Sequence, residues 1–165
     1  SAEPVRYQLT IPPAPSLEQA RAAMAGYSGY EDHMFPTCFV CGPGRRHRDG
    51  LELFPGPVDG GPLMACIWQV ADDLLGDSGL VRDEVMWSAL DCPGYFAAMQ
   101  GELRPALLGQ LEGEIRRSPG AGDPLIVYCW PEGGEGRKFY GATVVATAEG
   151  DILASSRSTW IELRA

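Results

Sequence analysis

The sequence predicts an α+β domain in which an antiparallel six-stranded sheet is wrapped round one long central helix. Three observations predict it: a strand-turn-strand pattern over residues 51–70, an apolar helical repeat from residue 83 to about residue 100, and four strand-like runs after residue 105. Strands that follow one another through short turns form an antiparallel sheet. A sheet with an apolar face needs a cover, and the helix supplies it. The predicted order is therefore β-β-α-β-β-β-β.

Residues 1–50 are predicted to form an N-terminal extension ahead of a main domain over residues 51–165. Residues 5–11 are strand-like. Ser16 and Gln19 have the spacing of a capping box, which predicts a short helix over residues 16–25 that ends near Gly26. Residues 33–50 are rich in Gly and Pro and are expected to form a loop that carries Cys and His.

The main domain begins with a hairpin, whose predicted strands are joined by a turn at residues 59–62. The helix is expected to start at Asp83 and to be kinked or interrupted at Pro93 and Gly94, because proline removes a backbone donor. The hairpin strands and the four later strands are predicted at residues 51–58, 63–70, 107–117, 125–130, 137–147 and 152–163.

Composition excludes several classes of protein. The length of 165 residues fits one domain, and the net charge of -9 argues against a nucleic-acid-binding protein. No apolar run approaches the roughly 20 residues that span a bilayer, so no membrane partner is expected. The opening residues do not have the pattern of a signal peptide, and five cysteines are an odd number. We therefore expect a reduced, cytoplasmic protein.

The approach to the helix carries the most informative motif. Residues 79–82 read Gly-Leu-Val-Arg, and Asp91 lies nine residues after Arg82 inside an otherwise apolar helix. A carboxylate on the core side of a helix is costly and usually marks chemistry or a specific hydrogen bond. This motif and the element order resemble the hotdog fold, and in particular the phenylacetate-type acyl-CoA thioesterases. Those proteins have Gly-x-Val-His-Gly-Gly at this turn and an Asp nine residues beyond the His, whereas this chain has Arg-Asp-Glu in place of His-Gly-Gly. Residues 35–42 also resemble a segment of a group of actinobacterial hotdog proteins.

The resemblance implies hydrolysis of an acyl-CoA or acyl-carrier-protein thioester in a homodimer or tetramer, without a cofactor for catalysis. Asp91 would be the general base or nucleophile, and the backbone N–H groups of Asp83 and Glu84 would bind the oxyanion. The alternative is that Asp91 satisfies a backbone or hydroxyl group at the helix kink. Glu84 is a second candidate carboxylate, or an acid favoured by the helix N-terminus.

Four residues are candidate ligand contacts. Gly79 and Arg82 lie in the approach turn, where Arg82 binds a carboxylate or phosphate or pairs with a neighbouring acid. Arg137 and Lys138, with Arg116 and Arg117, are candidates to contact coenzyme A phosphates, although surface cations are commonly only solvated.

A second cluster consists of His33, Cys38, Cys41 and His47. Cys-x-x-Cys with two flanking histidines is compatible with a structural tetrahedral zinc site. Buried core cysteines and a redox pair are the alternatives. Cys92 and the two remaining cysteines lie in apolar runs and are expected in the core, although Cys92 is also a conceivable nucleophile.

Two further functions are considered beside the thioesterase. The Arg-Asp-Glu turn motivates a non-catalytic hotdog protein that binds an acyl ligand or acts as a scaffold. A hotdog dehydratase or hydratase would need a catalytic His, and neither His33 nor His47 is expected near the central helix.

Overall fold

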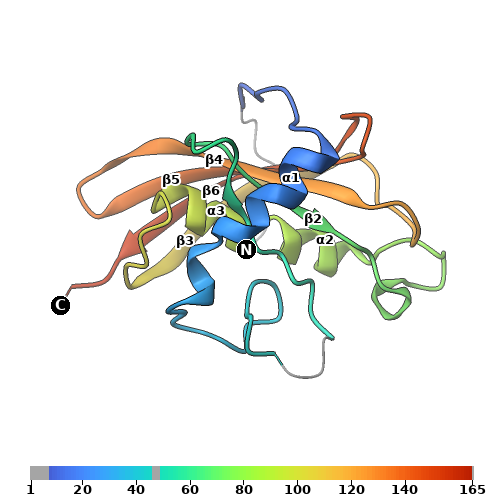
Figure 1. Cartoon of the computed structure of the whole chain (residues 1–165), viewed down its shortest axis with the longest axis horizontal. Coiled ribbons are helices and arrows are strands. Elements are labelled where there is room, and N and C mark those ends of the chain that lie inside the picture. The colour runs from blue at the N-terminus through green and yellow to red at the C-terminus, as the bar shows by residue number, and fades with distance from the viewer. Residues whose placement is uncertain (1–7, 46–48, 165) are drawn as a thin grey trace.

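The computed structural model describes residues 8–45 and 49–164, and its strands form one antiparallel sheet (Figure 1). The sheet has six strands in the order β1-β2-β4-β5-β6-β3. The strands are β1 (Gly56–Pro57), β2 (Met64–Trp68), β3 (Ala106–Ile115), β4 (Leu125–Glu135), β5 (Lys138–Ala146) and β6 (Ile152–Glu162). The predicted α+β class and the predicted strand order along the chain are confirmed.

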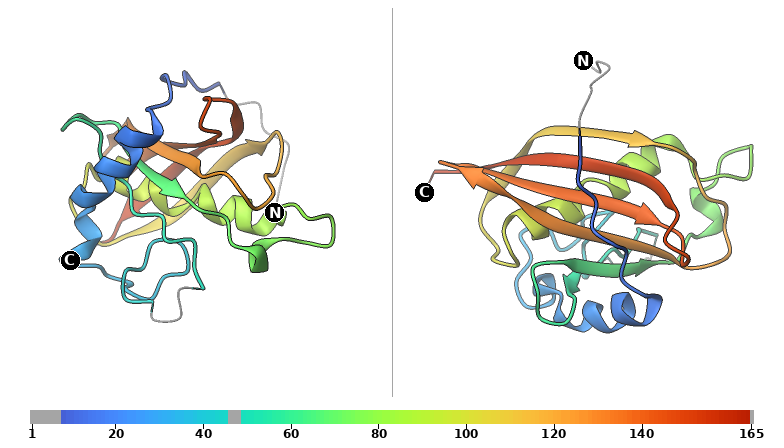
Figure 2. Two further views of the ribbon diagram at one scale, coloured as in Figure 1. Left: turned by 45° about the vertical axis from the view of Figure 1, so that its right-hand side comes forward. Right: turned by 90° about the horizontal axis from the view of Figure 1, so that it is seen from above.

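Helices cover both faces of this sheet. They are α1 (Leu17–Ala23), α2 (Asp83–Ala89) and α3 (Cys92–Ala98), with short 3₁₀ turns at Met24–Gly26, Ser28–Tyr30 and Asp72–Leu74. Along β4, Val127 and Cys129 belong to the core that includes α2 and α3, whereas Ile126 and Tyr128 belong to a second core that includes Ala20 of α1. This alternation is the period of two expected of a strand that is buried on both faces. In the right-hand view of Figure 2, seen from above, the curved sheet lies in front of α2 and α3.

Two glycines let α3 lie directly on the sheet. A Cβ atom added to Gly94 of α3 would collide with the Ser158 hydroxyl on β6. A Cβ atom added to Gly141 of β5 would collide with the backbone carbonyl of Gly94. The backbones of α3 and β5 are therefore in contact, which fixes the position of the helix start relative to the strands.

The central helix is broken rather than continuous. A kink or an interruption at Pro93 and Gly94 was predicted within residues 83–100, and the structure has two helices separated at Leu90 and Asp91. Pro93 has no N–H to continue the hydrogen-bond ladder. The Leu90 carbonyl instead accepts a hydrogen bond from the Ser156 hydroxyl of β6 at 3.0 Å. The sheet thus satisfies a backbone group that the break leaves free.

The first strand is much shorter than the predicted strand over residues 51–58. The N–H groups of Leu51 and Leu53 bond to the carbonyl groups of Phe39 and Val40 in the cysteine loop, not to the sheet. Only Gly56–Pro57 pairs with β2. The predicted hairpin exists, but half of its first strand holds the loop of the N-terminal extension against the domain.

The N-terminal extension also has its predicted helix. The Ser16 hydroxyl accepts from the Gln19 N–H at 3.1 Å and the Gln19 side chain accepts from the Ser16 N–H at 3.0 Å, which confirms the capping box. Residues 8–11 are not a strand, and residues 5–7 of that predicted element lie outside the described residues. The division of the chain at residue 50 stays a prediction. No helix within the described ranges is long and apolar enough to cross a membrane.

Candidate functional site

The start of α2 is an exposed, charged turn. Gly79 has a positive φ of 74°, a conformation that glycine adopts without strain. Arg82 is the N-cap of α2, and its Nε lies 3.4 Å from Oε1 of Glu84. The side chains of Arg82, Asp83 and Glu84 are all exposed. This pairing matches the alternative reading of Arg82 as a partner of a neighbouring acid.

Asp91 occupies the break between α2 and α3, in a very different environment. Its Oδ1 is buried and has no hydrogen-bond partner among the described residues. Burial, and to a smaller extent the nearby Cys38, raise the pKa of its carboxyl group to about 6. Leaving a buried carboxylate oxygen without a partner costs free energy. The alternative, that Asp91 has a purely structural role, predicts a hydrogen bond to a backbone or hydroxyl group. Oδ1 makes no such bond among the described residues.

Three thiols gather beside Asp91. The Sγ atoms of Cys38, Cys41 and Cys92 all lie within 4.8 Å of one another, and Cys38 Sγ lies 3.8 Å from Cys92 Sγ. Hydrogen bonds from the Cys41 and Cys92 thiols lower the pKa of Cys38, and the contact with Cys38 raises the pKa of Cys92. Cys92, which was expected in the core, therefore joins the loop of the N-terminal extension to the first turn of α3.

His33 belongs to the same cluster. Its Nε2 lies 3.4 Å from Cys41 Sγ, and its Nδ1 accepts a hydrogen bond from the Phe35 N–H at 2.9 Å. Its ring packs against Phe96 of α3, with the ring centroids 5.9 Å apart. The expectation that no histidine lies near the central helix is therefore wrong for His33. His47, the other predicted metal ligand, lies outside the described residues.

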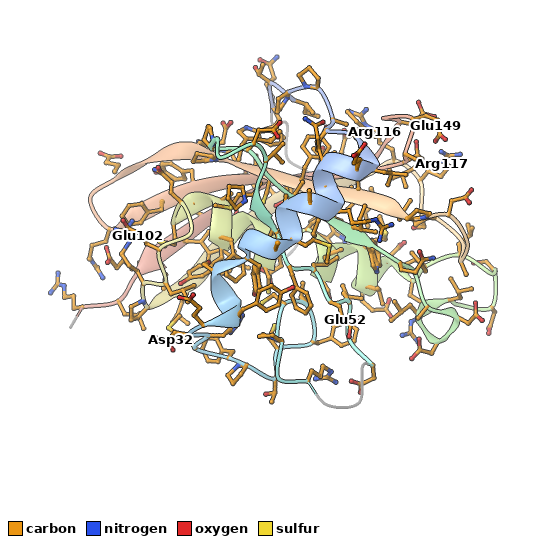
Figure 3. The ribbon with its side chains drawn as sticks, in the orientation of Figure 1. Asp32, Glu52, Glu102, Arg116, Arg117 and Glu149 are labelled. Carbon is orange, nitrogen blue, oxygen red and sulfur yellow. The ribbon has the colours of Figure 1, made fainter. Side chains whose placement is uncertain are left out.

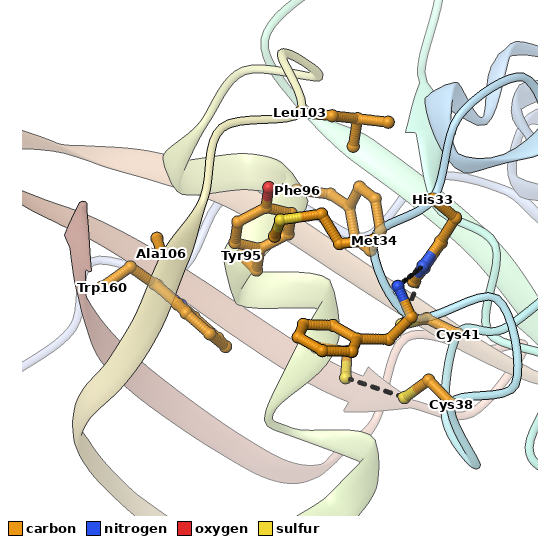
Figure 4. Close-up of a pocket in the computed structure, with 11 residues that line it drawn as sticks. His33, Met34, Cys38, Cys41, Tyr95, Phe96, Leu103, Ala106 and Trp160 are labelled. Carbon is orange, nitrogen blue, oxygen red and sulfur yellow. Dashed lines mark hydrogen bonds between the residues drawn. The ribbon is translucent and has the colours of Figure 1, made fainter. Parts of the chain in front are cut away.

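An apolar pocket of about 70 Å³ opens next to the thiols (Figure 4). In Figure 4, Tyr95 and Phe96 of α3 and Trp160 of β6 line one side, and the loop that carries His33 and Cys38 lines the other. The Tyr95 hydroxyl donates to the Arg104 carbonyl at 2.7 Å, so its ring is fixed in the wall. The pocket suits a small apolar group that enters between the extension and the central helix.

The candidate phosphate-binding cations do not form one patch. Lys138 pairs with Ile161 near the end of β6, beside Arg137, whereas the N–H groups of Arg116 and Arg117 bond to the Leu153 carbonyl at its start. Figure 3 shows Arg116 and Arg117 together at one end of the sheet. Arg137 is engaged in part, because its Nη1 donates to the Glu162 carbonyl at 3.0 Å. The four cations therefore lie at opposite ends of the strands.

Sequence reasoning placed Asp91 and the Cys-x-x-Cys but missed the partnership between them. The one clue in the sequence was Cys92, a third cysteine that directly follows Asp91. Tyr95 and Phe96 lie within the apolar helical repeat after residue 83, a pattern that indicates core packing and no more. Nothing in the sequence alone indicated that the loop would reach this turn of the helix.

No protein-family model matches the sequence, and a search of curated proteins gives no match either. Solved structures do match its fold. A thioesterase superfamily protein matches with a TM-score of 0.65 and 20% sequence identity, over 77% of this chain and 61% of that protein. AziG of S. sahachiroi matches with a TM-score of 0.63 and 19% identity, over 75% of this chain and 98% of AziG. E. coli PaaI, from the phenylacetic acid degradation operon, matches with a TM-score of 0.59 and 14% identity, over 70% of this chain and 82% of PaaI.

These similarities confirm the predicted fold: the chain shares the hotdog fold of these solved structures. The chain spans less than two thirds of the first of these structures. The likeness of residues 35–42 to actinobacterial hotdog proteins stays a prediction.

Proposed function

We propose that this protein hydrolyses acyl thioesters of coenzyme A or of an acyl-carrier protein, with Asp91 as general base or nucleophile. One observation carries the proposal: the Asp91 carboxylate is placed at the break of the central helix with a buried Oδ1 that bonds to no described residue. A group kept in so costly a state is expected where chemistry uses it. As a base it would take a proton from water; as a nucleophile it would attack the acyl carbon itself. In the base route the water adds to the acyl carbon, the C–S bond breaks, and the proton held by Asp91 passes to the departing thiolate. In the nucleophile route the thiolate leaves as a mixed anhydride of Asp91 forms; water then hydrolyses the anhydride to the free acid, restores the Asp91 carboxylate and supplies the proton of the thiol.

The oxyanion site of this proposal lies at the first turn of α2. The N–H groups of Val85 and Met86 bond to the Arg82 carbonyl, whereas those of Asp83 and Glu84 precede the first turn of the helical ladder. Because about two helical turns separate these groups from Asp91 in one chain, we keep Asp83 and Glu84 as backbone donors to a thioester oxygen held against Asp91 of a second protomer. Glu84 as the catalytic carboxylate is disfavoured, because its side chain is exposed and paired with Arg82.

A homodimer formed through β3 is part of the same proposal. β3 is an edge of the sheet and carries two exposed leucines, with Leu107 56% exposed and Leu108 38% exposed. The opposite edge, β1, has only two residues. A long apolar edge strand is a template for pairing with another chain, so a second copy is the expected occupant. Light scattering should give twice the monomer mass, and Leu107→Lys should shift it toward the monomer; a wild-type monomer would contradict this part.

The activity is tested with a panel of acyl-CoAs that differ in chain length and head group, by following release of free coenzyme A. Asp91→Asn should lower kcat/KM by at least about 100-fold, the scale of losing a general base. Asp123→Asn is the matched control, because the Asp123 side chain is exposed; it should stay within about threefold of wild type. An Asp91→Asn protein as active as wild type would remove Asp91 from the mechanism.

The second candidate is a non-catalytic hotdog protein that binds an acyl ligand. The apolar pocket beside Tyr95 and Trp160 favours it, as do the exposed acids at positions 83 and 84. If wild-type protein hydrolyses nothing in the panel yet shifts in melting temperature with an acyl-CoA, this candidate replaces the hydrolase. The dehydratase reading gains no support, because the His33 ring nitrogens contact Cys41 and Phe35.

A further inference from the structure

The three thiols at the helix break have the geometry of a metal site. Zinc bound by thiolates at about 2.3 Å in tetrahedral geometry places two sulfur ligands about 3.8 Å apart. Cys38 Sγ and Cys92 Sγ are separated by 3.8 Å, and Cys41 Sγ lies within 4.8 Å of both. One ion placed between them could therefore contact all three thiols with small side-chain adjustments.

The loop is built in advance to present these sulfurs. Residues 38–42 form a tight turn, in which the Gly42 N–H bonds to the Cys38 carbonyl at 3.0 Å. A Cβ atom on Gly42 would collide with the Cys38 nitrogen and the Pro36 carbonyl, so only glycine fits. This turn therefore holds the Cys38 and Cys41 thiols close together before any ion binds.

We propose that Cys38, Cys41 and Cys92 bind one thiophilic divalent metal ion, with zinc as the expected occupant. The ion would tie the loop of the N-terminal extension to the first turn of α3, and its binding would release the thiol protons to solvent. This site does not depend on the hydrolase proposal, since none of its ligands takes part in that reaction.

His33 has a supporting role in this site rather than that of the fourth ligand. Because Nδ1 accepts from the Phe35 N–H, the neutral ring carries its proton on Nε2, which faces Cys41 Sγ at 3.4 Å. His33 thus donates a hydrogen bond to the Cys41 thiolate, as residues around metal ligands commonly do. All three thiols line the pocket, so a water molecule in the pocket would complete the coordination of the ion.

The first test measures metal content. Full-length protein is purified in a phosphine reductant without chelator, and zinc is counted by mass spectrometry and reloaded by titration. We expect one equivalent per chain, lost in Cys38→Ser and Cys92→Ser and retained in Cys66→Ala. Cys66 is the matched control, because it is buried in the same core yet outside the cluster. Zinc retained at one equivalent in Cys92→Ser would overturn the proposal.

A second measurement on wild-type protein keeps the test decisive if those variants fail to fold. Cobalt(II) added to the zinc-free, reduced protein should give the intense near-ultraviolet band of thiolate ligation, with the intensity of three thiolates. Metal should also protect three of the five thiols from a thiol reagent in denaturant-free buffer. A reduced protein that binds neither ion at micromolar concentration, or that forms a Cys38–Cys92 disulfide in preference to binding zinc, would overturn it as well.

The role of His33 has its own readout. His33→Ala should keep one equivalent of metal and the cobalt spectrum, while the affinity falls about 10- to 100-fold, as expected for loss of a partner that orients a ligand. A changed cobalt spectrum would instead make His33 a direct ligand.

Discussion

The two helices of the broken central segment begin with acidic residues in opposite environments. α2 begins with Asp83 and Glu84, which are exposed and lie beside Arg82. α3 begins after Asp91, whose Oδ1 is buried without a described partner. An acid at the exposed start interacts with water and with the helix dipole at little cost. The same group at the buried start is costly, and that difference singles out Asp91.

The starts of α2 and α3 also differ in the contacts that hold them in place. The turn before α2 has open space around Gly79, where an added Cβ would meet nothing within 4 Å. The start of α3 is in contact with β5 and β6 through Gly94, and with the cysteine loop through Cys92. We infer that the start of α3 is the rigid part of the site and that the start of α2 tolerates change.

Substitution of the two glycines tests this difference most strongly. Gly94→Ala should lower the free energy of unfolding by about 3 kcal/mol, because the new methyl group collides with the Ser158 hydroxyl where α3 lies directly on the sheet. Gly79→Ala should cost only about 1 kcal/mol, the penalty of a left-handed conformation without a clash. Urea unfolding of both variants measures this, and equal losses would contradict a rigid α3 start.

The next largest difference in stability is expected between two serine hydroxyl groups, one that bonds at the helix break and one within α2. Ser156→Ala removes the donor to the Leu90 carbonyl and should cost about 1 to 2 kcal/mol, since a buried acceptor loses its partner. Ser88→Ala removes only a bond to the Glu84 carbonyl within α2 and should change stability by less than about 0.5 kcal/mol. Thermal unfolding of the pair decides it; a larger effect at Ser88 would show that the break is not supported by β6.

Much of the fold followed from the sequence because its signals are local. Alternating apolar residues and the Ser16 cap act over a few positions, and β2, β3, β5 and β6 lie close to their predicted bounds. β4 starts where predicted but continues past residue 130 to Glu135. The first strand was predicted too long because residues 51–53 pair with the cysteine loop. That pairing joins segments that are distant in the sequence, and no pattern within residues 51–58 predicts it.

The candidate site was predictable only in its parts. Asp91 stood out because one carboxylate interrupts an apolar helix, and Cys38 and Cys41 stood out through their spacing. Their proximity depends on how the extension folds back over α3, where Tyr27 packs on Phe96 with ring centroids 4.8 Å apart. Contacts between elements of this kind are set by packing, which a single sequence does not display.

Neutralising the two acids gives the smallest and most diagnostic contrast. Asp91→Asn should raise the free energy of unfolding at pH 7 by about 1 kcal/mol, because a neutral amide loses less on burial than an unpaired carboxylate does. Glu84→Gln should stay within about 0.5 kcal/mol of wild type, since its ion pair with Arg82 is exposed. Calorimetry on the two variants measures both values. If Asp91→Asn is more stable than wild type and no longer hydrolyses thioesters, the carboxylate costs the fold stability and serves the reaction. If Asp91→Asn is less stable than wild type, the carboxylate is a structural group.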